Sequence, residues 1–204
     1  AMSGEDVGAR YYTRVVVEND FHTEKLLEFV QNFNMALFDK AEAEKIISKS
    51  IEPNEDGNNE YLSEVDIHSS FDTITFADLN PTQLTKPIPS IKEIDDSYAI
   101  IQLKYMISAT ENKVLENYYI TEDYRVRYVD EENVYLLDYK RNQEALFTPD
   151  NVNLTSNSFK IGVTKDEDYQ YMANAKQTKV AFTQARQLWY YDYNGGTITN
   201  VYGL

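Results

Sequence analysis

The segment from Tyr98 to Tyr139 constrains the fold most strongly, because it holds three runs with the two-residue alternation of β-strands. In the first run, apolar residues share one face: Ala99, Ile101, Leu103, Tyr105 and Ile107. In the second run, one face holds Tyr118, Ile120, Tyr124, Val126 and Tyr128, and the other holds Thr121, Asp123, Arg125 and Arg127. The third run, Val134 to Lys140, follows a polar tetrapeptide, 130–133, that is typical of a hairpin loop. We therefore expect an antiparallel sheet with one buried and one solvated face.

Helices are predicted ahead of this sheet. Asp20 and Thr23 are favourable N-cap residues, and a single apolar stripe with helical spacing follows them: Leu26, Phe29, Val30, Phe33 and Leu37. A second helix is predicted from Lys40 to Ile51, before Pro53. We also expect a short third helix over 61–71 that leads into a strand over 72–76.

We expect one α+β domain over residues 20–204, preceded by a tail or an extra strand over 1–19. The run RYYTRVVVE at 10–18 favours the strand, with a docked extended tail as the alternative. Residues 51–90 are predicted to form a long loop excursion, because the segment is polar at its start and holds three prolines near its end. Residues 166–188 fit either a helix or, from Lys179 to Tyr193, a strand. The turn Asn194-Gly195-Gly196 predicts a closing hairpin.

The net charge of −15 is unevenly distributed, and it bounds the partners. Counting Lys, Arg, Asp and Glu gives −3 for residues 1–50, −9 for 51–100, −4 for 101–150 and +1 for 151–204. A negative field repels phosphates, so direct binding to nucleic acid or to an anionic lipid surface is disfavoured. The absence of cysteine removes disulfides, thiolate metal sites and cysteine nucleophiles.

Residues suited to catalysis or metal binding are few. His22 and His68 are the only histidines, and no phosphate-binding loop or nucleophile motif occurs. An EF-hand loop with Gly57 at its sixth position would place Ser63 where a bidentate glutamate is required. We therefore expect no enzyme activity, no metal and no cofactor.

The 17 tyrosines suggest half-buried sheet surfaces or a contact face. The candidate binding residues lie in and around the terminal hairpin: Trp189, Tyr190, Tyr191, Tyr193 and Tyr202. Clustered aromatic residues contribute much of the energy of protein interfaces. Packing within the sheet is the alternative role for the same side chains.

The long helix LLEFVQNFNMALF, followed by the runs 98–139 and 189–202 as sheet, resembles the cystatin-like α+β roll, the nuclear-transport-factor-two-like fold. Within that superfamily the chain is similar to soluble domains of type IV secretion proteins that assemble conjugation channels in Gram-positive bacteria. The resemblance implies a non-enzymatic scaffold on the extracytoplasmic side of the cell membrane. It also implies an N-terminal membrane anchor missing from this sequence, and contacts with other channel proteins.

Two other functions stay open from the sequence. One is a surface or secreted ligand-binding or carbohydrate-binding module, in which Trp189 and the adjacent tyrosines form a stacking platform. The other is an enzyme that uses a small pocket of the same fold, with His68 or an acidic residue as the base. Self-association into a homo-oligomer is open as well.

Overall fold

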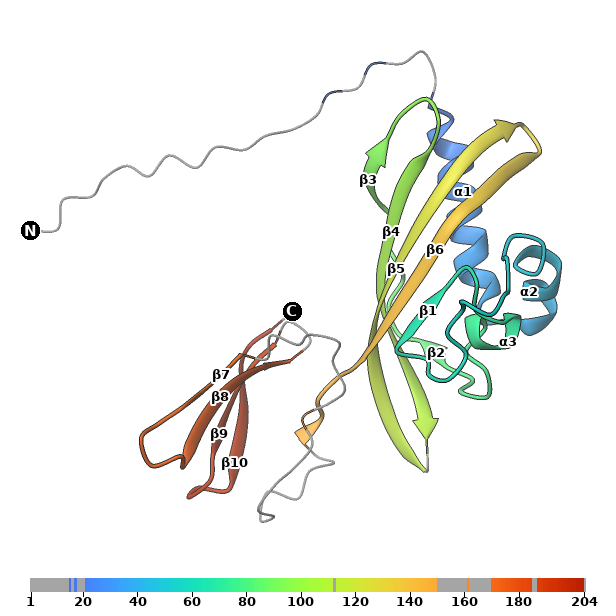
Figure 1. Ribbon diagram of the computed structural model, residues 1–204. Helices are drawn as coiled ribbons and strands as arrows, with labels where there is room; N and C mark the ends of the chain where they lie inside the picture. The colour runs from blue at the N-terminus through green and yellow to red at the C-terminus, as the bar shows by residue number, and fades with distance from the viewer. Residues whose placement is uncertain are drawn as a thin grey trace, which may run out of the picture.

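The computed structural model describes residues 15, 17, 21–111, 113–149, 161, 170–184 and 187–203, and these form an α+β structure with antiparallel strand pairs (Figure 1). The helices are α1 Thr23–Ala36, α2 Lys40–Ile46 and α3 Phe71–Ile74. The strands are β1 Glu64–Asp66, β2 Thr82–Gln83, β3 Ser90–Ile94, β4 Ala99–Glu111, β5 Val114–Asp130, β6 Asn133–Ala145, β7 Tyr171–Ala173, β8 Lys179–Gln184, β9 Gln187–Asp192 and β10 Thr197–Tyr202.

The large sheet has the order β1-β6-β5-β4-β2, and β3 also pairs with β4. Its inner face carries the predicted apolar alternation, because every residue of the first run, from Ala99 to Ile107 in steps of two, is buried. Helix α1 covers this face (Figure 1) and buries Leu26, Val30 and Phe33 against it. The predicted sheet, its buried face and the turn between β5 and β6 are confirmed.

The small sheet has the order β10-β9-β8-β7 and its own hydrophobic cluster. Gln184 of β8 connects it to the end of β6: its Oε1 accepts a hydrogen bond from the Phe147 backbone N–H at 3.1 Å, and its Nε2 donates to the Ala145 carbonyl. The helix alternative for 166–188 is wrong over 171–184 and 187–188, where β7, β8, the turn between them and the start of β9 lie. The closing hairpin β9–β10 is confirmed.

The predicted helix over 61–71 and strand over 72–76 are wrong, because β1 lies in the first segment and α3 opens the second. Val65 of β1 is buried and pairs with Arg141 of β6, so the sheet takes this segment as an edge strand. Asp66 Oδ1 then accepts the backbone N–H groups of the next turn, and Ser70 caps α3 by accepting from Thr73 N.

The segment 51–90 thus holds β1, α3 and β2 rather than a loop throughout, and its residues Val65, Ile74 and Phe76 belong to the main core. On the C-terminal side, β6 extends beyond the predicted Lys140 to Ala145, because β5 pairs with it as far as Ala145 and β1 pairs with its residues 140–142. Strand pairing therefore determines both the structure within segment 51–90 and the end of β6.

Helix ends also differ from prediction. The N-cap of α1 is His22, with a positive φ of 49° and no side-chain capping bond, so Thr23 is instead the first helical residue. Asp20 lies outside the described residues. Helix α2 ends at Ile46 rather than Ile51, and the Ser50 hydroxyl donates to the Ile46 carbonyl at 3.0 Å, which satisfies an acceptor at the helix end. Of the predicted strand at 10–18, the structure describes only Val15 and Val17, which are exposed and in no strand.

Candidate functional site

The predicted aromatic residues of the terminal hairpin divide between the two faces of the small sheet. Trp189 and Tyr191 point into its core, where they are 7% and 8% exposed. The Trp189 ring meets Phe147 edge-on, with centroids 5.1 Å apart, and Phe147 packs in the same way on Phe182. These two candidate binding residues therefore stabilise the sheet and do not form a surface.

Tyr190 lies on the opposite face, together with the residues that directly face it across the strands. The register pairs Met172 with Ala181, Ala181 with Tyr190, and Tyr190 with Thr199. Tyr202 pairs with Leu188 on the same side. We call this set the open face: Met172, Ala181, Leu188, Tyr190, Thr199 and Tyr202.

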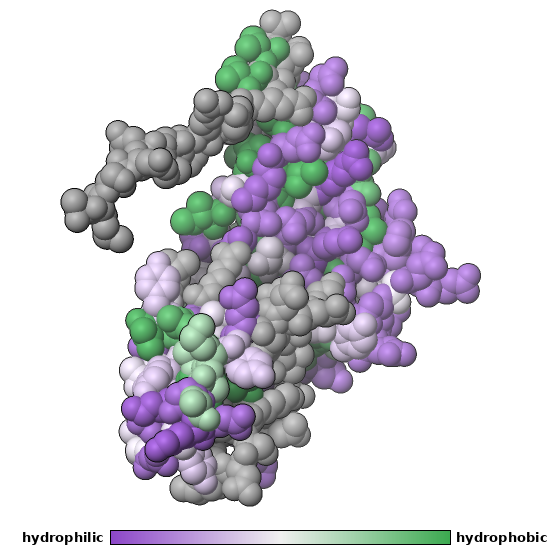
Figure 2. Space-filling model, turned by 60° about the vertical axis from the view of Figure 1, so that its left-hand side comes forward, coloured by the Kyte–Doolittle hydropathy of each residue, from purple (hydrophilic) through white to green (hydrophobic). Residues whose placement is uncertain are grey.

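The open face is apolar in its middle and accessible to a partner. Met172 is 77% exposed and Tyr202 is 72% exposed, whereas Tyr190 is half-buried between its neighbours. Figure 2 shows green and pale residues together with a purple patch over the small sheet, and a largely purple surface with several green patches over the large sheet. Methionine and tyrosine side chains adapt to a protein surface and are enriched in interface cores.

One ion pair borders the open face. Lys179 Nζ lies 3.7 Å from Asp192 Oδ2, and these residues face each other in the register of β8 and β9. A hydrogen bond with the Tyr190 side chain, reinforced by the nearby Asp192 carboxylate, raises the pKa of Lys179 above its usual range. The fifth predicted residue, Tyr193, follows β9, is half-exposed, and contacts Tyr191 edge-on.

A buried carboxylate in the large sheet was missed from the sequence. Glu122 of β5 occupies the inner face between Ile120 and Tyr124, and it is fully buried. Its Oε2 accepts hydrogen bonds from Asn34 Nδ2 and the Tyr124 hydroxyl, and its Oε1 accepts from the Tyr139 hydroxyl, each at 2.8 Å. The signal was available, because position 122 continues the alternation of the apolar face.

Arg141 of β6 lies directly opposite Glu122 and is equally buried. Its guanidinium donates to the carbonyls of Thr73 and Ile74 in α3 and lies 3.8 Å from the centroid of the Phe76 ring. Burial raises the pKa of Glu122, and the Arg141 charge partly opposes that shift.

The groups around Glu122 bind one another and are shielded from solvent. An acid or base must reach the proton that it transfers, directly or through one water. The Glu122 carboxylate instead accepts hydrogen bonds from three side chains of the core. The arrangement joins α1 to the sheet across 88 residues of sequence, from Asn34 to Glu122, and its role in this structure is to hold the helix in register.

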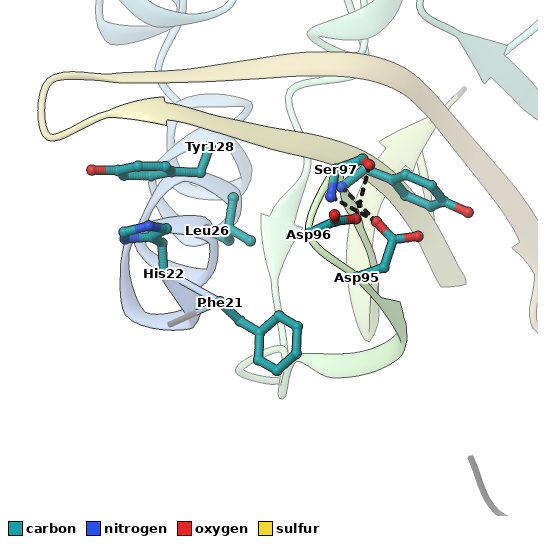
Figure 3. A pocket seen from close by; sticks show the side chains of 8 residues that line it. Phe21, His22, Leu26, Asp95, Asp96, Ser97 and Tyr128 are labelled. Atoms are coloured by element: carbon teal, nitrogen blue, oxygen red, sulfur yellow. Dashed lines mark hydrogen bonds between the residues drawn. The ribbon is translucent and has the colours of Figure 1, made fainter. Parts of the chain in front are cut away.

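A pocket of about 200 Å³ lies where α1 begins, beside the turn between β3 and β4 (Figure 3). His22 closes one side by stacking on the Tyr128 ring, with centroids 3.6 Å apart. On the other side, Asp95 Oδ1 accepts the backbone N–H groups of Ser97 and Tyr98, so this carboxylate shapes the turn. The lining combines aromatic and acidic side chains, and the Ser97 hydroxyl donates a hydrogen bond to Asp96 Oδ1 at 3.1 Å.

The second histidine, His68, is also held by contacts within the fold. His68 Nδ1 lies 3.0 Å from the Glu52 carbonyl oxygen and 2.9 Å from Asn54 Nδ2. The bond to the Glu52 backbone raises the pKa of His68, and the Asp66 carboxylate adds to the shift. Among the described residues, no three potential metal-binding side chains gather at one point.

Comparison with protein-family models, with curated proteins and with solved structures finds no match to this chain. None of the helices in the described ranges combines the length and the apolar character needed to cross a bilayer.

Proposed function

We propose that this chain is a non-enzymatic interaction domain that holds other proteins in a membrane-associated assembly. The observation that supports this proposal is the open face of the small sheet. It presents Met172, Leu188, Tyr190 and Tyr202 on one side of a sheet whose other side is filled by its own aromatic core. A rigid sheet with an adaptable apolar surface suits a protein partner, because little conformational entropy is lost when the partner binds.

We assign the domain to the nuclear-transport-factor-two-like roll. The element order supports it, since a long amphipathic helix is followed by a long antiparallel sheet that packs on it. Within that fold, we infer the extracytoplasmic part of a membrane-anchored protein that assembles a conjugative type IV secretion channel in a Gram-positive bacterium. The acidic charge of the first 150 residues supports contacts with proteins over contacts with DNA.

The state of the polar groups favours this function over its two rivals. Glu122 is enclosed by hydrogen bonds within the core. His22 stacks on Tyr128, and His68 contacts the Glu52 carbonyl. The rival reading as a carbohydrate-binding module needs an accessible Trp189, which is instead packed against Phe147 and Phe182.

The function is tested in a conjugative donor strain from which the full-length gene is deleted and then restored. We expect deletion to lower the conjugation frequency, and the intact gene to restore it. A gene with Tyr190→Ser and Tyr202→Ser should restore transfer poorly, because each interface tyrosine contributes about 2 kcal/mol, or roughly 30-fold in affinity. Tyr61→Ser is the matched control, since Tyr61 is exposed outside the small sheet.

Unchanged transfer from the deletion strain would refute the conjugation role. Reduced transfer from the deletion strain, together with full restoration by the doubly substituted gene, would refute the open face as the contact surface. Circular dichroism of the purified variants separates loss of contact from loss of folding.

A further inference from the structure

Strand β10 is the most accessible edge for strand pairing in the described structure. Its partner there is β9, and no described strand pairs with its other edge. The strand holds Thr, Ile, Thr, Asn, Val and Tyr, with no charged residue and no proline. Its Val201 is 58% exposed. An edge strand with these properties is a template for another strand.

The other outer strands are protected from such pairing. Strands β1 and β7 have three residues each, and β1 carries two acidic side chains. Strand β2 has two residues and follows Pro81, and β3 contains Lys92, Glu93 and a register shift. Short length, charge, proline and bulges are the usual protections of sheet edges. In β10, only the shift between Asn200 and Tyr202 interrupts the ladder.

The charge distribution indicates what pairs with β10. Residues 151–204 carry a net charge of +1 and the first 150 residues carry −16, which together give the total of −15. Two copies of the chain repel each other through most of their length, and they approach at least cost through this segment.

The sequence of β10 also allows the strand to pair with itself. A two-fold axis perpendicular to the sheet keeps each side chain on the same face in both copies, so an axis at Thr199 places Thr199 opposite Thr199 of the partner subunit, a favourable cross-strand pair. The same axis places Ile198 opposite Asn200 of the partner subunit, on the face that holds Trp189 and Tyr191, and brings no charged residues of the strand together. A two-fold contact requires this match of a surface with itself.

We propose that β10 pairs with β10 of a second copy of this chain, so that two small sheets join into one eight-stranded antiparallel sheet. The contact is confined to one strand from each copy and is smaller than a standard protein interface, so dimerisation is expected at roughly micromolar or higher concentration. This self-association uses the backbone edge of β10, whereas partner binding uses the open face, and Thr199 and Tyr202 belong to both.

Sedimentation velocity of the purified chain over a range of concentrations tests the dimer. We expect a reversible shift from monomer to dimer, and Val201→Lys should weaken it at least about tenfold, because two like charges would then lie at the contact. Val129→Lys is the matched control: it adds the same charge to an exposed residue of β5, and it should dimerise as the unsubstituted chain does. A chain that stays monomeric, or an equal loss with both variants, would overturn the dimer.

Cross-linking tests the register, since the chain has no cysteine of its own. Directly opposite residues in antiparallel strands have Cα atoms about 5 Å apart, within reach of a disulfide. A Thr199→Cys chain should therefore form a covalent dimer with itself under mild oxidation. An Asn200→Cys chain should form little, because its two cysteines would be offset by two residues, about 7 Å, along the strands. Equal cross-linking in the two variants, or none with Thr199→Cys, would overturn the pairing of β10 with itself.

Discussion

Replacement of Glu122 by leucine should destabilise the protein strongly, because this carboxylate accepts three hydrogen bonds in the core. Leucine leaves one amide and two hydroxyl donors without their acceptor, at about 1–3 kcal/mol each. The relief of a desolvated carboxylate offsets part of this loss, whereas Arg141 stays buried and charged. We expect a net loss of about 3–5 kcal/mol, the range found when one partner of a buried pair is removed.

Urea unfolding measures this loss. With a slope of roughly 2 kcal/mol per M, the midpoint should fall by about 2 M. Thr121→Leu is the matched control, since Thr121 is the neighbouring residue on the other face of β5, and its substitution should cost less than about 1 kcal/mol. A Glu122→Leu variant as stable as the unsubstituted protein would show that burying the carboxylate costs as much as its hydrogen bonds contribute.

The same experiment tests the predicted single domain. Trp189 is the only tryptophan and lies in the core of the small sheet, so its fluorescence follows that sheet, whereas far-UV circular dichroism follows both. If residues 20–204 unfold as one cooperative unit, Glu122→Leu lowers both midpoints equally. A fluorescence midpoint that does not move would mean that the small sheet unfolds independently.

Three further predictions concern pH, close approach and packing. Burial raises the folded-state pKa of Glu122 above its ordinary 4.5, so protonation of this side chain favours the folded state. The stability gained from protonation is full below the unfolded pKa and is lost as pH rises through the folded pKa. The stability advantage over Glu122→Gln, measured by urea unfolding, should therefore grow as pH is lowered through this window; a constant or shrinking advantage contradicts the shift. Gly57→Ala should cost about 2–3 kcal/mol in the same assay, because its Cβ would lie 2.0 Å from a backbone carbonyl oxygen, whereas at Gly195 the nearest atom is 3.5 Å away and alanine should cost little. Phe33→Ala should lower stability by about 3–5 kcal/mol, and Met35→Ala, on the exposed side of α1, by less than about 0.5 kcal/mol; similar losses would contradict the assignment of the core face.

Strong periodicity made the main elements predictable. The apolar stripe of α1 and the two-residue alternation in β4 and β5 each bury one face, and a long amphipathic pattern leaves little choice of secondary structure. Glycines at the turn and β-forming residues on both sides likewise made the hairpin β9–β10 predictable. The assignment to the nuclear-transport-factor-two-like roll stays a prediction.

Short segments were not predictable, because their local preferences are weak. Segment 61–76 has too few residues for a helical or strand period to emerge, and the pairing of Val65 with β6 decides its conformation. Similarly, the alanines and glutamines of 171–184 favour a helix locally, but the burial of Phe182 against Phe147 favours β8. In both places tertiary contacts outweigh propensity.

The site was predictable only in part, for the same reason. Alternation placed Tyr190 and Tyr191 on opposite faces of a strand, but the sequence did not indicate which face would be covered. In the structure, Trp189 and Tyr191 pack in the small-sheet core with Phe147, which follows β6. Tyr190 and Tyr202 therefore lie on the open face.

The sequence by itself determined where apolar residues recur, and hence α1, the long strands and the acidic character of the first 150 residues. Only the tertiary structure decided that Glu122 and Arg141 would lie buried opposite each other, and that β10 would be an outer strand. The physical reason is that periodicity is local, whereas burial and strand neighbours depend on segments far apart in the chain.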